Sequence, residues 1–131
     1  MATESELIDA ALKARENAVA DYSHFRVGAA LETESGEIFT GCNVENATYG
    51  LTACAERVAV WKALSEGRRQ FRRIAIAADS EALTPPCGPC RQILWEFCGD
   101  IPVILGNLQG QRETLQLREL LPRAFDRSFL K

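Results

Sequence analysis

The chain has 131 residues, of which 47% are hydrophobic and 25% are charged, and its formal net charge is −3. This length predicts one domain over residues 1–131, and the hydrophobic share is too high for a disordered chain. The acidic balance disfavours a nucleic-acid partner, because the phosphate backbone attracts clustered Lys and Arg. The basic residues between 68 and 73 are interpreted as a solvated helix end and loop.

The opening segment and the cysteines predict a cytoplasmic protein with no membrane partner. Charged side chains recur through residues 1–22, which leaves no apolar run for a secretory signal or a membrane span. Five cysteines, an odd number, do not fit a disulfide framework. We therefore expect reduced cysteines that pack, bind metal or react.

The first segment has the spacing of a helix. Apolar residues recur every three or four positions from Leu7 to Val19. Thr3, followed three residues later by Glu6, predicts a capping box at the start of this helix. We expect the helix to end at residues 22–24.

The rest of the chain alternates between strand and helix patterns. In chain order we expect strands at 27–34 and 38–44, a loop at 45–50, a helix at 53–66, a strand at 74–78, an extended loop at 85–86, a helix at 88–98, strands at 103–105 and 111–116, and a short helix at 117–121. This alternation predicts an α/β fold, a single layered domain with one mixed sheet of about five strands and helices on both faces.

Two motifs at predicted helix starts predict a zinc site. Cys87 and Cys90 form a Cys-x-x-Cys pair, which lets two thiolates bind one ion from a single turn. Cys54, at the start of another helix, would supply the third ligand. Catalytic zinc typically has three protein ligands and an open position for water. The positive end of a helix also favours thiolates.

The charges around this site predict roles for two further residues. Three thiolates and one zinc ion carry a formal charge of about −1, which would oppose the activation of bound water. Arg57, three residues after Cys54, can donate to the site and offset that charge. Glu56 is not needed as a ligand, and a carboxylate beside activated water can take up and pass on its proton. This arrangement resembles the signature of zinc nucleobase deaminases.

Three further segments extend the pattern to nearly the whole chain. They are 22–29 (YSHFRVGA), 42–47 (CNVENA) and 120–122 (LLP) together with Phe125. With the zinc motifs, the chain resembles the small homotetrameric cytidine deaminases. The resemblance implies a cytidine deaminase-like fold and a homotetramer whose pockets are shared between subunits.

The resemblance also implies the substrate contacts. Phe25 would stack on the pyrimidine ring, and Asn43 and Glu45 would bind the ribose 3′-hydroxyl group. The backbone N–H of Ala55 would meet the carbonyl of the base. Tyr49 and Phe125 would serve the pocket of a neighbouring subunit.

The implied reaction is hydrolytic deamination of cytidine and deoxycytidine to uridine and deoxyuridine, with release of ammonia. It uses one zinc ion per chain, attack of zinc hydroxide at C4, and Glu56 as the proton shuttle. Pro85 departs from the family pattern, in which Ser or Thr is usual on this leaving-group side. A stiffer loop there leads to the hypothesis that the pocket accepts N4-substituted cytidines.

Other interpretations of the same residues stay open. A related zinc deaminase of blasticidin S or of a free base would keep the zinc motifs without needing Asn43 and Glu45. A fourth thiolate from Cys42 or Cys98 would close the site and make it structural. The chain would then be a zinc-stabilised interaction module without enzymatic activity.

Overall fold

A computed structural model describes residues 1–130 and contains one five-stranded mixed sheet with the strand order β2-β1-β3-β4-β5. The strands are β1 (Val27–Thr33), β2 (Ile38–Cys42), β3 (Phe71–Ala78), β4 (Pro102–Asn107) and β5 (Arg112–Gln116). The α-helices are α1 (Glu4–Arg15), α2 (Ala55–Ser65), α3 (Gly88–Cys98) and α4 (Leu117–Leu120), and short 3₁₀ turns cover Tyr49–Leu51 and Arg127–Phe129. The predicted α/β class and the predicted sheet are therefore confirmed.

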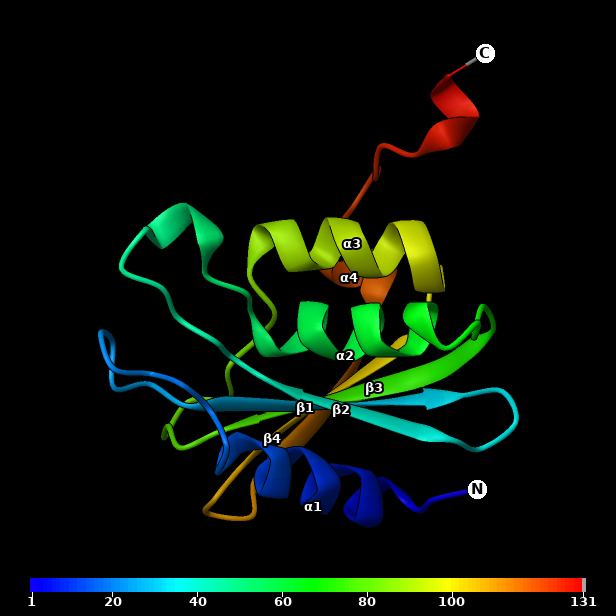
Figure 1. The fold of residues 1–131 in the computed structure, drawn as a ribbon. Coiled ribbons are helices and arrows are strands. Elements are labelled where there is room, and N and C mark those ends of the chain that lie inside the picture. Colours follow the sequence, from blue (N-terminus) through cyan, green and yellow to red (C-terminus); the bar gives the residue numbers. More distant parts are fainter. Residues whose placement is uncertain (131) are drawn as a thin grey trace.

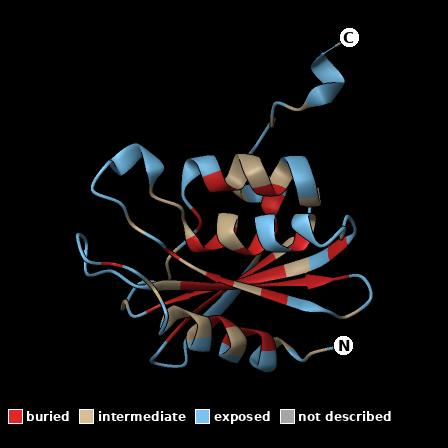
Figure 2. Ribbon diagram, in the orientation of Figure 1, coloured by how far each residue is buried: buried red, intermediate tan, exposed pale blue. Residues whose placement is uncertain are grey.

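Helices cover both faces of the sheet, as predicted. Figure 1 shows α1 below the sheet, with α2, α3 and α4 above it. The central strands are buried on both sides, which Figure 2 shows as red strands between the layers. Small side chains such as Ala30 and Ala75 face α1, while larger ones such as Leu31 and Ile74 face α2 and α3. This alternation gives the thicker core to the side that carries the candidate site.

Strand direction brings the starts of α2 and α3 together. Both β2 and β3 pair antiparallel with β1, so they run in the same direction. Helix α2 follows β2, and α3 follows β3. Each helix therefore starts from the carboxyl end of a strand at the same edge of the sheet. Val27, at the start of β1, pairs with Ala78 at this edge, so the loop before β1 also ends there.

A glycine sets how closely α2 packs on the sheet. A Cβ atom added to Gly41 would lie 2.4 Å from the backbone oxygen of Ala55 and 2.6 Å from the backbone nitrogen of Ala59. No larger residue fits without moving the helix. Gly41 thus holds the first turn of α2 directly against β2.

The first helix is shorter than the spacing predicted. It ends at Arg15, although its predicted capping box between Thr3 and Glu6 is present. Val19 instead forms a parallel bridge with Val44, and its backbone N–H donates to the oxygen of Asn43 at 2.9 Å. Pairing with a distant segment therefore overrides the helical spacing of Val19.

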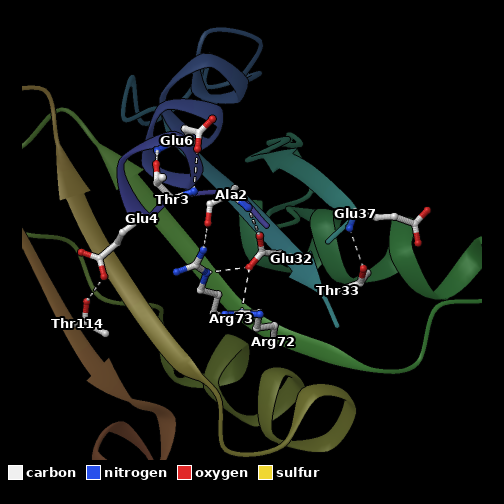
Figure 3. Close-up of polar contacts among 10 residues, drawn as sticks. All are labelled: Ala2, Thr3, Glu4, Glu6, Glu32, Thr33, Glu37, Arg72, Arg73 and Thr114. Atoms are coloured by element: carbon white, nitrogen blue, oxygen red, sulfur yellow. Dashed lines mark hydrogen bonds and ion pairs between the residues drawn. The ribbon is translucent and has the colours of Figure 1, made fainter. Parts of the chain in front are cut away.

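A buried ion pair joins β1, β3 and the segment before α1 (Figure 3). The Glu32 side chain is fully buried, and Arg73 Nε lies 2.9 Å from its Oε1 atom. The backbone N–H of Ala2 donates to Glu32 Oε2 at 3.1 Å, while Arg73 also donates to the oxygen of Ala2. Arg72 adds a longer contact of 3.7 Å. These contacts satisfy a carboxylate that would be costly to bury alone.

Within residues 1–130, none of the helices has the length and apolar character needed to cross a bilayer.

Candidate functional site

Three cysteine sulfur atoms meet at the edge of the sheet where α2 and α3 begin. Cys54 and Cys87 are the N-cap residues of α2 and α3, and Cys90 lies in the first turn of α3. The sulfur of Cys87 lies 3.6 Å from that of Cys54 and 3.2 Å from that of Cys90. All three sulfurs lie within 4.8 Å of one another. This donor set suits zinc, which thiolates bind tetrahedrally at about 2.3 Å.

The other two cysteines lie outside this cluster. Among residues 1–130, the cluster of possible metal ligands contains Cys54, Cys87 and Cys90 alone. Cys42 and Cys98 are partly buried free thiols, and burial raises the pKa of Cys98 to about 12. The described residues thus offer three ligands, and a tetrahedral zinc ion held by them would have one position open for water.

The cluster also carries asymmetric charge. The interaction with Cys90, and then that with Arg57, lower the pKa of Cys54 to about 5. The interaction with Cys54, and then burial, raise the pKa of Cys90. The two shifts have opposite signs because the two thiols lie in contact, so that ionisation of one disfavours ionisation of the other.

Arg57 is the cation next to this thiolate, as the sequence predicted. Its Nη2 atom lies 3.5 Å from the sulfur of Cys54 and donates to the backbone oxygen of Thr52 at 3.0 Å. Its guanidinium carbon lies 5.9 Å from the centre of the Trp61 ring. Arg57 is therefore held on two sides in a place where it offsets negative charge.

Glu56 lies in the first turn of α2, two residues after Cys54, and is almost completely buried. Burial raises the pKa of its carboxyl group to about 7, with the charge of Cys54 adding to the rise. A carboxyl group with such a pKa can both accept and release a proton near neutral pH. Glu56 faces the same cavity as Cys54 and Cys87.

This cavity has a volume of about 240 Å³ and contains most of the predicted site. The predicted residues that line it are Phe25, Asn43, Glu45, Cys54, Ala55, Glu56, Pro85 and Cys87. Sequence reasoning missed five other lining residues, namely Ser23, Val27, Thr52, Ile76 and Thr84. All of these except Ile76 lie within two residues of predicted site residues, and this proximity was a signal that could have found them.

Asn43 and Glu45 line the cavity and also hold its wall. The side-chain nitrogen of Asn43 donates to the oxygen of Phe25 at 2.8 Å, and its side-chain oxygen accepts from Val27 N–H at 2.9 Å. Glu45 Oε1 accepts from the backbone N–H groups of Tyr22 and Ser23 at 2.9 and 3.0 Å. Hydrogen bonding to Ser23, and then to Tyr22, lowers the pKa of Glu45. The loop that carries Phe25 is thus fixed by these two side chains.

Comparison with known proteins assigns this site to a family. Residues 1–105 match the model of the cytidine and deoxycytidylate deaminase zinc-binding region. A cytidine deaminase from Halalkalibacterium halodurans is 53% identical over 120 residues, which cover 91% of each chain.

The chain belongs to the cytidine and deoxycytidylate deaminase family.

Solved structures agree with this assignment. The crystal structure of cytidine deaminase from Burkholderia pseudomallei is 47% identical, has a TM-score of 0.92, and is matched over 95% of this chain and 100% of that chain. A blasticidin-S deaminase from Bacillus cereus is more distant, at 28% identity over 131 residues, which cover 94% of this chain and 92% of that protein. Family membership confirms the predicted resemblance and the predicted enzyme class, a zinc-dependent hydrolytic deaminase. The predicted zinc cofactor is confirmed by the family's zinc-binding region together with the three-cysteine cluster.

Two predicted substrate-binding residues of this deaminase lie outside its own cavity. Tyr49 is 76% exposed and Phe125 is 57% exposed. Tyr49 packs edge-on against Tyr22, with ring centres 6.1 Å apart, and Phe125 stacks on Phe129 at 5.5 Å. Their predicted role in a neighbouring subunit stays a prediction.

Proposed function

We propose that the chain catalyses hydrolytic deamination of cytidine and deoxycytidine to uridine and deoxyuridine, releasing ammonia. The observation that carries this proposal is the shared cavity of Cys54, Cys87 and Glu56, with Phe25 at its rim. The cavity is lined by two sulfur atoms of the three-cysteine cluster and by a buried proton carrier, Glu56. This combination suits hydrolysis of a small planar substrate. The 53% identical relative is itself a cytidine deaminase.

Cys54, Cys87 and Cys90 would hold one zinc ion per chain. When bound, zinc supplies the Lewis acidity that activates water for attack on C4 of the base. Glu56 takes a proton from the attacking water and delivers it to N3. It then carries a second proton to the amino group, which leaves as ammonia. Arg57 offsets the negative charge of the thiolates throughout.

The cavity wall would orient the nucleoside. Phe25 stacks on the pyrimidine ring, and the backbone N–H of Ala55 donates to the carbonyl of the base. Asn43 and Glu45 bind the ribose 3′-hydroxyl group. Glu45 has the capacity for this contact, since an ionised carboxylate has about four acceptor positions and loop groups occupy three of them.

Pro85 marks the side on which the amino group would leave. It lines the cavity together with Thr84 and lies in the loop between β3 and α3, two residues before Cys87. A proline keeps its backbone oxygen but stiffens the loop, and we propose that the pocket there accepts N4-substituted cytidines. Comparing the turnover of cytidine with that of N4-alkyl and N4-acyl cytidines tests this proposal, and the absence of turnover for every analogue would contradict it.

We further propose that the chain is one domain over residues 1–131 and acts in the cytoplasm as a homotetramer. The exposed aromatic rings of Tyr49 and Phe125 support shared pockets, because exposed aromatic side chains are typical of interfaces. The acidic net charge of −3 fits a nucleoside substrate better than a nucleic-acid partner. Light scattering that gave a monomer would contradict the shared pocket.

The decisive experiment follows the loss of cytidine absorbance with zinc-loaded protein, using blasticidin S and cytosine as competing substrates. We expect turnover of cytidine and deoxycytidine, with one zinc ion per chain. A Glu56→Ala variant should keep its zinc and lose about 10²–10⁴-fold in kcat. Turnover of cytosine or blasticidin S alone would favour the related deaminases. Zinc binding with no turnover of any substrate would favour the interaction module.

A further inference from the structure

The loop that carries Phe25 has little packing to hold it. Residues 21–26 are all exposed, and Phe25 itself is 39% exposed although it lines the cavity. His24, next to Phe25, has a φ angle of 58°, in the left-handed region that few residues other than glycine adopt. Such a conformation persists only when surrounding contacts impose it.

Ser23 makes the side-chain contact that links this loop to Glu45. Its hydroxyl group donates to Glu45 Oε2 and accepts from the backbone N–H of Phe25 at 3.0 Å. Glu45 Oε1 meanwhile accepts from the N–H groups of Tyr22 and Ser23. The hydroxyl group of Ser23 is therefore the bridge between the carboxylate of Glu45 and the backbone of Phe25.

We propose that Ser23 is a positioning residue that fixes Phe25 and Glu45 relative to each other. This inference rests on the proposed function, in which Phe25 meets the base and Glu45 meets the ribose. The distance between base and ribose in a nucleoside is set by covalent bonds, so the two wall residues must keep a matching separation. Asn43 also holds the backbone of Phe25, through side-chain hydrogen bonds to Phe25 and Val27, but neither of these hydrogen bonds involves Glu45.

The position of Ser23 decides which kinetic constant changes. Ser23 lines the cavity at the end defined by Glu45 and makes no hydrogen bond to Glu56 or to a cysteine of the cluster. Its loss should weaken substrate and transition-state binding alike, which raises KM and leaves kcat nearly unchanged. A hydrogen bond to a charged group has a strength that corresponds to a rise of about tenfold or more in KM.

The test compares Ser23→Ala with a matched serine. Ser35 also donates to a glutamate, Glu37, but at 3.3 Å in the turn between β1 and β2 at the far end of the sheet. We expect Ser23→Ala to raise KM for cytidine about tenfold with unchanged zinc content, and Ser35→Ala to change neither. Ser23→Thr keeps a hydroxyl group and should restore KM to within about threefold of wild type. An unchanged KM in Ser23→Ala, or an equal rise in Ser23→Thr, would overturn the proposal.

Hydrogen exchange measured by mass spectrometry gives a readout that needs no substrate. The peptide covering residues 21–27 should exchange at least several-fold faster in Ser23→Ala, while Ser35→Ala should leave it unchanged. Equal exchange in Ser23→Ala and wild type would show that the bridge does not hold the loop. If wild-type protein failed to deaminate cytidine, the proposed function would be wrong, and the exchange rates would still decide whether Ser23 orders the loop.

Discussion

Arg57 donates from one nitrogen both to the sulfur of Cys54, at 3.5 Å, and to the backbone oxygen of Thr52, at 3.0 Å. The second contact fixes the guanidinium group, so that its charge stays beside the thiolate. Lysine could supply the charge but would lack the planar guanidinium group that also lies over the Trp61 ring.

Replacing Arg57 by glutamine should therefore weaken the metal centre. We expect zinc affinity or kcat to fall by about 10–100-fold, the usual effect of losing a residue that supports metal ligands. Zinc titration and steady-state kinetics would measure the two effects. Arg69→Gln is the matched control, since Arg69 is exposed and donates only to backbone oxygens. An Arg57→Gln enzyme with wild-type zinc affinity and kcat would contradict the charge argument.

Removal of zinc should lower both activity and stability. Because the three cysteines come from the starts of two different helices, a bound ion would join α2 to α3. A ligand present at about 1,000 times its Kd stabilises the folded state by about 4 kcal/mol. We expect a chelator to abolish turnover and to lower Tm in a calorimetric scan, with recovery on adding zinc. Cys98→Ser should respond like wild type, whereas a Cys87→Ser variant whose Tm still fell with chelator would argue against this ligand set.

The two glutamates of the β1–β2 hairpin should differ in their effect on stability. Glu32 is fully buried against Arg73, so Glu32→Gln leaves a largely buried guanidinium group without its countercharge and should cost about 2–3 kcal/mol. Glu37 pairs with Arg68 at the surface, where water screens the two charges, so Glu37→Gln should destabilise the protein far less than Glu32→Gln. Urea unfolding of both variants measures the difference. Equal free energies of unfolding would show that burial does not strengthen the Glu32 contacts.

The loop contacts of Glu45 should persist at mildly acidic pH. Hydrogen bonds from Ser23 and Tyr22 lower the pKa of Glu45 below its ordinary value of 4.5. A lowered pKa in the folded state means that these contacts stabilise the fold above pH 4.5 and are lost as pH falls through the lowered pKa. We expect the amide NMR signals of Tyr22 and Ser23 to shift with a midpoint below 4.5, and a midpoint at or above 4.5 would contradict the contacts.

Local sequence patterns predicted those helix ends that are determined by residues close in sequence. The predicted bounds of α3 match because Pro89 lies in its first turn, where proline is tolerated. The predicted end of α1 was wrong because the bridge between Val19 and Val44 joins residues that are distant in sequence.

In the candidate site, too, the features set by local sequence were predicted, and those set by distant contacts were not. The spacing of Cys87 and Cys90 in the sequence predicted a pair of metal ligands directly. The short distance from this pair to Cys54, in contrast, depends on the order of the strands in the sheet. Ile76 lines the cavity only because β3 is central in the sheet, which no local motif reveals. Ser23 was part of a recognised segment, but its bridge to Glu45 joins residues 22 positions apart.

The residues of the site gather at one edge of the sheet, so insertions at that edge would disturb the cavity, whereas the opposite edge is free of site residues. The turn at Ser35–Gly36 lies at the far end of the hairpin, beyond the paired residues Glu32 and Ile38. A peptide inserted there would lengthen an exposed turn without displacing any strand that carries the cavity. A fluorescent or affinity tag could therefore be placed inside the chain at this turn, leaving the segments around Tyr49 and Phe125 free for subunit contacts.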